Sequence, residues 1–223
     1  MLRREQSWRD PHQSLKEPPL PPALIQAVIF DFGNVLCTFD NGRIAAALAP
    51  VCGLSPGELA RRIQGSDLPR AYEAGEIPSP VFLAGISALC GCAFEESFFV
   101  RAFSDIFTPI PGNWQLVREL EGRVRLGLLS NTNPWHFEHG IRATPIFPLF
   151  EAVTLSFEVG ALKPDRRIFE DILAKLDLPP EACAFVDDIP AFVEGARRLG
   201  MHGIPFTGPE ALRTALRGLG LEA

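Results

Sequence analysis

The sequence lacks an apolar run long enough to cross a membrane, which takes about 18 consecutive apolar residues. Its longest run, around Ala23 to Phe30, is interrupted by Gln26 and followed by Asp31. Arg3 and Arg4 near the start are not followed by the apolar segment of a secretion signal. We therefore expect no membrane partner and a cytoplasmic protein.

The sequence also lacks a regular cysteine pattern and an excess of positive charge. Its five cysteines are odd in number and irregularly spaced, and Cys90 and Cys92 have no second pair to complete a zinc site. We expect the cysteines to be small apolar core residues of a protein in a reducing compartment. The net charge of −6 argues against nucleic acid as a partner. The 223 residues, 47% of them hydrophobic, are enough to bury a sizeable core.

Three regions differ in their pattern. Residues 1–22 are polar and rich in proline, which predicts a disordered or extended leader outside the core. Residues 41–107 show helical spacing of apolar residues between Gly/Pro/Ser breaks, which predicts an inserted helical cap. Residues 23–40 and 108–223 alternate strand-like and helix-like segments and form the expected core.

Five short apolar runs in that core predict strands, which are residues 27–32, 125–132, 152–156, 183–188 and 202–206. Amphipathic segments that predict helices lie between most of them, for example from Pro164 to Leu176 and from Pro190 to Leu199. Strands that alternate with helices favour a parallel sheet with right-handed connections. The expected fold is therefore α/β, a Rossmann-like parallel sheet with an inserted helical cap.

Polar residues end several of the predicted strands. Asp31 ends the first, Ser130 with Asn131 ends the second, and Asp187 with Asp188 ends the fourth. Ligands bind beyond the carboxyl ends of such strands. Carboxylates gathered there repel one another and need a cation, and their hard oxygens favour Mg²⁺. Lys163, one of only three lysines, precedes a predicted helix and can balance phosphate charge.

This ordered set resembles the haloacid dehalogenase-like superfamily over roughly residues 26 to 207. The four matching segments are DFGNVL at 31–36, LLSNTN at 128–133, the lysine of GALKPDRRIF at 160–169, and FVDD at 185–188. The predicted helical insert resembles the cap of that superfamily. The resemblance implies a Mg²⁺-dependent phosphatase of a small phosphorylated metabolite, which works through an aspartyl phosphate.

The resemblance also implies roles for individual residues. Asp31 would be the nucleophile and a metal ligand, and the main-chain carbonyl of Gly33 would bind the metal. Ser130 and the main-chain amide of Asn131 would hold phosphoryl oxygens, and Lys163 would bridge nucleophile and phosphate. The remaining implied metal ligands are Asp188, bound directly, and Asp187, adjacent or through water.

One departure concerns the second aspartate that most of these phosphatases carry two residues after the nucleophile, where this chain has Gly33. That aspartate protonates the leaving group and activates water, a contribution of about 10²–10⁴-fold. A subset with the D-x-G-N-V form, which includes phosphatases of sugar 1-phosphates, resembles this chain further in S-N-T-N-x-x-H. His136 is a candidate auxiliary acid or base, and contact with substrate or a helix cap are alternatives.

A second departure is the segment Ile189–Phe192, which in the subset that this chain resembles is polar and supports the metal. A weaker metal site, or support from Asp165, would follow. Two alternatives stay open, a degenerate non-catalytic binding protein and a metal-independent 2-haloacid dehalogenase. In the cap and hinge, Arg43, Tyr72 and Glu73 are candidate substrate contacts, and a homodimer is compatible with the sequence.

Overall fold

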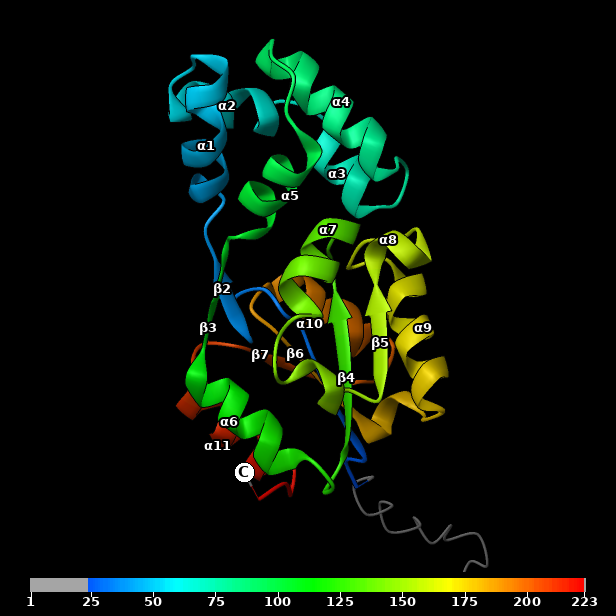
Figure 1. The fold of residues 1–223 in the computed structure, drawn as a ribbon. Coiled ribbons are helices and arrows are strands. Elements are labelled where there is room, and N and C mark those ends of the chain that lie inside the picture. The colour runs from blue at the N-terminus through cyan, green and yellow to red at the C-terminus, as the bar shows by residue number, and fades with distance from the viewer. Residues whose placement is uncertain (1–23, 223) are drawn as a thin grey trace, which may run out of the picture.

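The computed structural model describes residues 24–222, and a five-stranded parallel sheet lies at its centre (Figure 1). The strand order is β5-β4-β1-β6-β7. The strands are β1 (Ala27–Phe30), β4 (Arg125–Ser130), β5 (Ala152–Leu155), β6 (Cys183–Asp187) and β7 (His202–Pro205). They lie within the five predicted segments, so the predicted α/β, Rossmann-like sheet is confirmed. The predicted leader, residues 1–22, lies outside the described residues.

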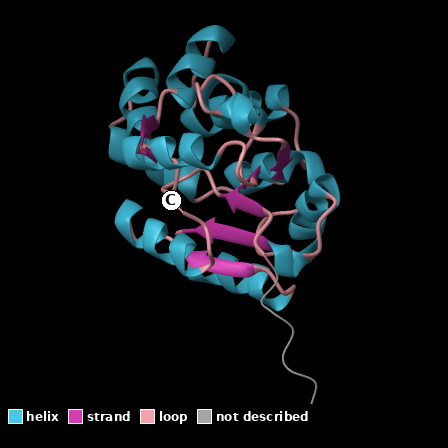
Figure 2. Ribbon diagram, turned by 90° about the horizontal axis from the view of Figure 1, so that it is seen from below, coloured by secondary structure: helices cyan, strands magenta, loops and turns pink. Residues whose placement is uncertain are grey.

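Helices cover both faces of the sheet (Figure 2). Val28 and Phe30 of β1 pack on one face with α6 (Pro111–Leu120) and α11 (Pro209–Gly218). Ala27 and Ile29 pack on the other face with α9 (Arg166–Leu176) and α10 (Pro190–Arg198). Strands that are buried on both faces carry apolar residues without alternation, which is why the central strand reads as a continuous apolar run.

The order of the strands reverses at β1. The chain runs from β1 to β4 and β5 on one side and returns to β6 and β7 on the other. The loops that leave neighbouring strands at such a point diverge and open a crevice at the carboxyl edge of the sheet. Asp31 directly follows β1 and is placed at this crevice.

Five helices, α1 to α5, follow β2 and lie beyond the carboxyl edge of the sheet (Figure 1). They pack around an aromatic cluster in which the ring of Tyr72 stacks on Phe82, and Trp135 of the core packs against both Phe82 and Phe99. We call this helical unit the cap, and its expected bounds at residues 41 and 107 stay a prediction. The helices are α1 (Gly42–Leu48), α2 (Pro56–Gln64), α3 (Leu68–Glu73), α4 (Ser79–Cys90) and α5 (Glu96–Ser104).

Two short antiparallel strands, β2 (Cys37–Phe39) and β3 (Phe107–Pro109), carry the chain out to the cap and back. The sequence did not predict them, because three residues show no alternation and the paired segments lie about 70 positions apart. No helix within residues 24–222 is both long and apolar enough to cross a membrane. The remaining short elements are η1 (Ala49–Cys52), α7 (Pro134–His136), η2 (Phe137–Ile141), η3 (Phe147–Leu149), α8 (Ser156–Val159) and η4 (Pro180–Ala182).

The expectation that every cysteine is a free core residue is wrong for two of them. Cys52, at the end of η1, and Cys92, just after α4, form a disulfide within the cap. Cys37, Cys90 and Cys183 are free and buried, as expected. The spacing of 40 residues contains no signal for this pair, since the packing of α2 against both α4 and η1 brings the two sulfurs together.

Candidate active site

Three neighbouring strands place buried polar residues at one edge of the sheet. Asp31 follows β1, Ser130 is the last residue of β4, and Asp187 is the last residue of β6. Because β1 pairs with both β4 and β6 in parallel, these residues come together as predicted. Their exposed fractions are only 7%, 3% and 0%. Polar groups this deeply buried need partners.

Lys163 supplies the central partner, from the loop before α9. Its Nζ lies 2.8 Å from Oδ1 of Asp31 and 2.6 Å from Oδ2 of Asp187. A third donor reaches the main-chain oxygen of Leu129 at 3.3 Å. An ammonium group has three donors, so all three are used. The side chain is 1% exposed, and the two carboxylates compensate the burial of its charge.

The carboxylates outnumber the cation at this edge. Asp31, Asp187 and Asp188 each offer an oxygen within 4.8 Å of the others. Burial raises the pKa of Asp31 to about 6; Lys163 opposes this shift and Asp187 adds to it. Burial also raises the pKa of Asp187. This excess of negative charge, carried by hard oxygen donors, fits a divalent cation such as Mg²⁺.

The two adjacent acids differ in how their oxygens are used. Oδ1 of Asp187 accepts a hydrogen bond from the main-chain amide of Ile189 at 2.8 Å, and its Oδ2 is bonded to Lys163. Oδ2 of Asp188 accepts from Nδ2 of Asn34 at 3.1 Å. Asp187 thus has both oxygens engaged, whereas Asp188 is less buried and has one hydrogen-bonded oxygen within the described residues. This difference agrees with the implied direct role of Asp188, which stays a prediction.

The unusual segment Ile189–Phe192 contributes to the site without side-chain oxygens. The ring of Phe192 lies 5.1 Å from Nζ of Lys163, and the ring of Phe185 lies at 5.5 Å. Aromatic faces attract a nearby ammonium group. Asp165, the suggested substitute, instead caps α9 and forms an ion pair with Arg167. The structure therefore does not bring Asp165 to the carboxylates.

The residues after β4 hold the lysine loop in place. The side-chain oxygen of Asn131 accepts from the main-chain amide of Lys163 at 2.8 Å, and its Nδ2 donates to the Lys163 carbonyl at 3.4 Å. The Ser130 hydroxyl has only a 3.5 Å contact to the Asn131 carbonyl. A hydroxyl with so weak an internal partner remains available to donate to a ligand.

Gly33 lies beside the ring of Phe39. A Cβ atom added at Gly33 would lie 3.1 Å from a ring carbon of Phe39, which is tighter than an ordinary contact. Phe39 comes from β2, and its backbone is paired with Phe107 of β3. The place of the usual second aspartate is thus bordered by an aromatic ring, which would have to shift slightly to admit a side chain there.

His136 is bonded at both ring nitrogens. Nε2 lies 3.0 Å from the main-chain oxygen of Phe103, which can only accept, so Nε2 carries the proton. Nδ1 then accepts from Nδ2 of Asn133 at 3.0 Å. The ring also stacks on the Phe103 ring, and burial lowers its pKa to about 4. The predicted auxiliary acid–base role is not supported, because the neutral ring has no free proton and instead connects α7 to the cap.

We expect His136→Leu to lower the free energy of unfolding by about 1–3 kcal/mol, since the buried Phe103 carbonyl would lose its donor. The shape of the pH–rate profile should not change. Chemical denaturation and a pH series measure the two effects. His139→Leu, at an exposed histidine in η2, is the matched control and should alter neither. A pH limb that disappears in His136→Leu would restore the acid–base role.

Two cavities that share lining residues lie between the sheet edge and the cap. The smaller, about 90 Å³, is lined by Gly33, Ser130 and Asn131 among others. The larger, about 320 Å³, extends into the cap. Asn41, Glu73 and His136 line both. Glu73 therefore lies at the candidate site, and its role as a substrate contact stays a prediction.

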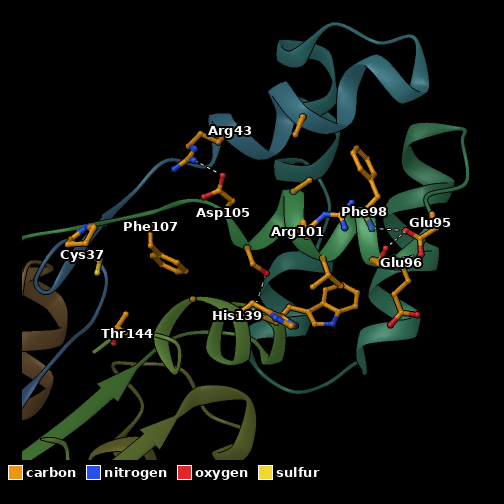
Figure 3. Close-up of a pocket in the computed structure, with 18 of the residues that line it drawn as sticks. Cys37, Arg43, Glu95, Glu96, Phe98, Arg101, Asp105, Phe107, His139 and Thr144 are labelled. Atoms are coloured by element: carbon orange, nitrogen blue, oxygen red, sulfur yellow. Dashed lines mark hydrogen bonds and ion pairs between the residues drawn. The ribbon is translucent and has the colours of Figure 1, made fainter. Parts of the chain in front are cut away.

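The other two cap candidates behave differently. Tyr72 lines the larger cavity but is fully buried in the cap core, and its hydroxyl bonds with Oγ of Ser79 at 2.7 Å. Arg43 pairs with Asp105 at 2.6 Å, on a broad outer groove of about 1280 Å³. Figure 3 shows these two side chains facing each other there, on the same groove as Phe107 and His139. Arg43 is not among the residues that line the two cavities between the sheet edge and the cap.

Ser156 is a site residue that the sequence reasoning missed. It follows β5, accepts from the main-chain amide of Thr132 at 2.9 Å and donates to the main-chain oxygen of Glu73 at 2.6 Å. It therefore ties the cap to the loop after β4. The strand-end rule that selected Asp31 and Ser130 would have selected it too. Phe39 and Phe192 carry no such signal, since an aromatic residue is usually a core residue.

Comparison with known proteins identifies the family. The model of the haloacid dehalogenase-like hydrolases matches residues 25–200. A phosphatase of Mycobacterium tuberculosis is 27% identical over 80% of this chain and 85% of its own length. A D-ribitol-5-phosphate phosphatase of Bacteroides thetaiotaomicron is 23% identical over 80% of this chain and 90% of its own length. Mouse acyl-CoA dehydrogenase family member 10 is 28% identical over 87% of this chain, which spans only 19% of that protein.

Solved structures agree with the fold. A haloacid dehalogenase-like (HAD-like) hydrolase of Porphyromonas gingivalis has a TM-score of 0.75 at 25% identity. The match covers 88% of this chain and 98% of that hydrolase. A HAD family enzyme of Bacteroides thetaiotaomicron, in complex with magnesium and inorganic phosphate, has a TM-score of 0.73 at 22% identity. The match covers 81% of this chain and 93% of that enzyme. Because the family model matches residues 25–200, most of this chain, the chain belongs to the haloacid dehalogenase-like hydrolases.

Proposed function

We propose that this hydrolase is a Mg²⁺-dependent phosphatase that cleaves a small phosphorylated metabolite through an aspartyl phosphate on Asp31. The observation that carries the proposal is the buried Lys163, which joins Asp31 to Asp187 at the sheet edge beside Ser130. A phosphoryl group there would meet a nucleophile, a fixed positive charge and a hydroxyl donor. Positioning and electrostatics of this kind supply most of the catalysis of phosphoryl transfer. The phosphatases among the relatives support this reaction class.

Each residue has a distinct task in this proposal. Asp31 attacks phosphorus in line with the leaving oxygen. The Ser130 hydroxyl and the main-chain amide of Asn131 hold the phosphoryl oxygens, and Lys163, whose donors reach Asp31, Asp187 and the Leu129 carbonyl, places its positive charge beside them. The residues that would hold Mg²⁺ are Asp31, Asp188, the Gly33 carbonyl and, directly or through water, Asp187. The ion would supply further positive charge to the phosphoryl oxygens.

The larger cavity supports a small leaving group of mixed polarity. Its apolar lining comes from cap residues such as Ile44 and Ile63, and its polar lining includes Asn41 and Asn133. Its volume of about 320 Å³ is at the lower end for small-molecule sites. A sugar or polyol phosphate, with hydroxyls for the polar lining, fits this description.

The direct test is a panel of p-nitrophenyl phosphate and sugar and polyol phosphates, with Mg²⁺ and with EDTA. We expect turnover with Mg²⁺, a loss of at least about 100-fold in EDTA, and recovery when Mg²⁺ is restored. Halide release from 2-chloropropionate in EDTA would instead assign a dehalogenase. Absence of turnover on the whole panel would assign a non-catalytic binding protein.

A further inference from the structure

Glu73 combines a position at the candidate site with a carboxylate that has no hydrogen-bond or ion-pair partner among residues 24–222. It is the last residue of α3 and lines both the cavity beside Gly33 and the cavity in the cap. A leaving group that extends from a phosphoryl group beside Ser130 into the cap would lie against the residues that the two cavities share. Glu73 therefore borders the place where the bond to the leaving oxygen breaks.

The position of Glu73 is fixed by contacts between cap and core. Ser156 donates to its main-chain oxygen at 2.6 Å and is itself bonded to Thr132 of the loop after β4. Two residues on, Gly75 has φ +70°, and a Cβ there would lie 2.1 Å from the main-chain oxygen of Phe157. Only glycine allows so close an approach in this backbone conformation. The cap turn that carries Glu73 is thus docked on the core.

The charged and titratable neighbours of Glu73 are already engaged. Of those that line the two cavities, Arg70 pairs with Asp67 and Glu76, the Tyr72 hydroxyl bonds with Ser79, and His136 is bonded at both nitrogens. Within residues 24–222, the Glu73 carboxylate has no hydrogen-bond or ion-pair partner. Burial in these surroundings raises its pKa to about 7. A carboxyl group with such a pKa can both give and take a proton near neutral pH.

We propose that Glu73 is the general acid and base of this enzyme, in place of the side chain that Gly33 lacks. The inference rests on the proposed phosphatase function. In the first step an Asp31 oxygen bonds to phosphorus, the bond from phosphorus to the leaving oxygen breaks, and that oxygen takes the proton of Glu73. In the second step Glu73 takes a proton from water, the water oxygen bonds to phosphorus, and the bond to Asp31 breaks. Both carboxyl groups return to their starting states.

The test compares Glu73→Gln with the wild type on two substrates. One is p-nitrophenyl phosphate, whose leaving group departs without protonation, and the other is the alkyl phosphate of the panel that the wild type hydrolyses fastest. We expect kcat/KM to fall about 100-fold for the alkyl phosphate and less than about threefold for p-nitrophenyl phosphate. A burst of p-nitrophenol should precede slow turnover, because loss of the base slows the second step.

The pH profile supplies a readout that a structural role would not change. With the alkyl phosphate, wild-type kcat/KM should fall as the pH rises through the pKa of Glu73, since the acid form is needed, and this limb should be absent in Glu73→Gln. Glu73→Asp keeps an acid and should retain this limb of the pH profile at a lower rate. This variant also provides a test if Glu73→Gln does not fold. Glu96→Gln, at an exposed cap position, is the matched control.

Three results would overturn the proposal while leaving the phosphatase function intact. They are an equal loss on both substrates, no loss on either, and a wild type that hydrolyses only aryl phosphates. Failure of the phosphatase function itself would look different, since the wild type would then show no Mg²⁺-dependent hydrolysis of p-nitrophenyl phosphate.

Discussion

Replacing Asp31 with Asn is expected to abolish hydrolysis of every phosphate ester, with a loss on the order of 10⁴-fold or more, as for other enzymes that lose their nucleophile. The amide has nearly the same shape but cannot form an aspartyl phosphate. Lys163 keeps its contact with Asp187, so the fold should survive. Steady-state rates, with acid quenching to trap a phosphorylated protein, measure the loss.

The matched control is Asp177→Asn. Asp177 is exposed at the end of α9 with φ +48°, a conformation that asparagine also adopts readily. This variant should keep the wild-type rate. A rate within tenfold of the wild type in Asp31→Asn, or a phosphorylated form of that variant, would assign the nucleophile elsewhere.

Replacing Lys163 with Met should damage both activity and stability. Asp31 and Asp187 would then lie buried without their shared cation, which we expect to lower the free energy of unfolding by about 3–5 kcal/mol. Turnover should fall about 10²–10³-fold or more, since a positive charge next to the phosphoryl group is lost. Urea denaturation in EDTA and Mg²⁺-dependent rates measure the two effects.

Lys175→Met is the control for the lysine. Lys175 pairs with Asp171 at 2.7 Å, but its side chain is 39% exposed. Exposed pairs of this kind contribute about 1 kcal/mol or less, and we expect a change of that size without loss of activity. Equal destabilisation in both variants would contradict the central place of Lys163 in the buried charge cluster.

The site at the sheet edge could be predicted because it depends on local pattern and topology. Three apolar runs predict buried parallel strands with polar ends. They end in Asp31, Ser130 and Asp187. Parallel strands place those ends at one edge, so the residues meet whatever the length of the connections. The rare Lys163 before a helix completed the set.

The contacts between cap and core could not be predicted in the same way. The bond from His136 to the Phe103 carbonyl spans 33 positions, and the bond from Ser156 to Glu73 spans 83. No periodicity links such residues. The sequence therefore suggested an acid–base role for His136 and a substrate contact for Arg43, whereas packing engages both elsewhere.

The sequence by itself determined the sheet, the edge at which we expect ligands to bind and the first residues of the site. Apolar runs with polar ends are enough to predict buried strands, and their alternation with helices is enough to predict a parallel sheet. Only the tertiary structure decided which remaining polar groups are free to react. It bonds His136 at both nitrogens and places the ring of Phe39 beside Gly33. It leaves the carboxylate of Glu73 without a partner among the described residues, because the docking of the cap on the core, and not the local pattern, determines which groups find partners.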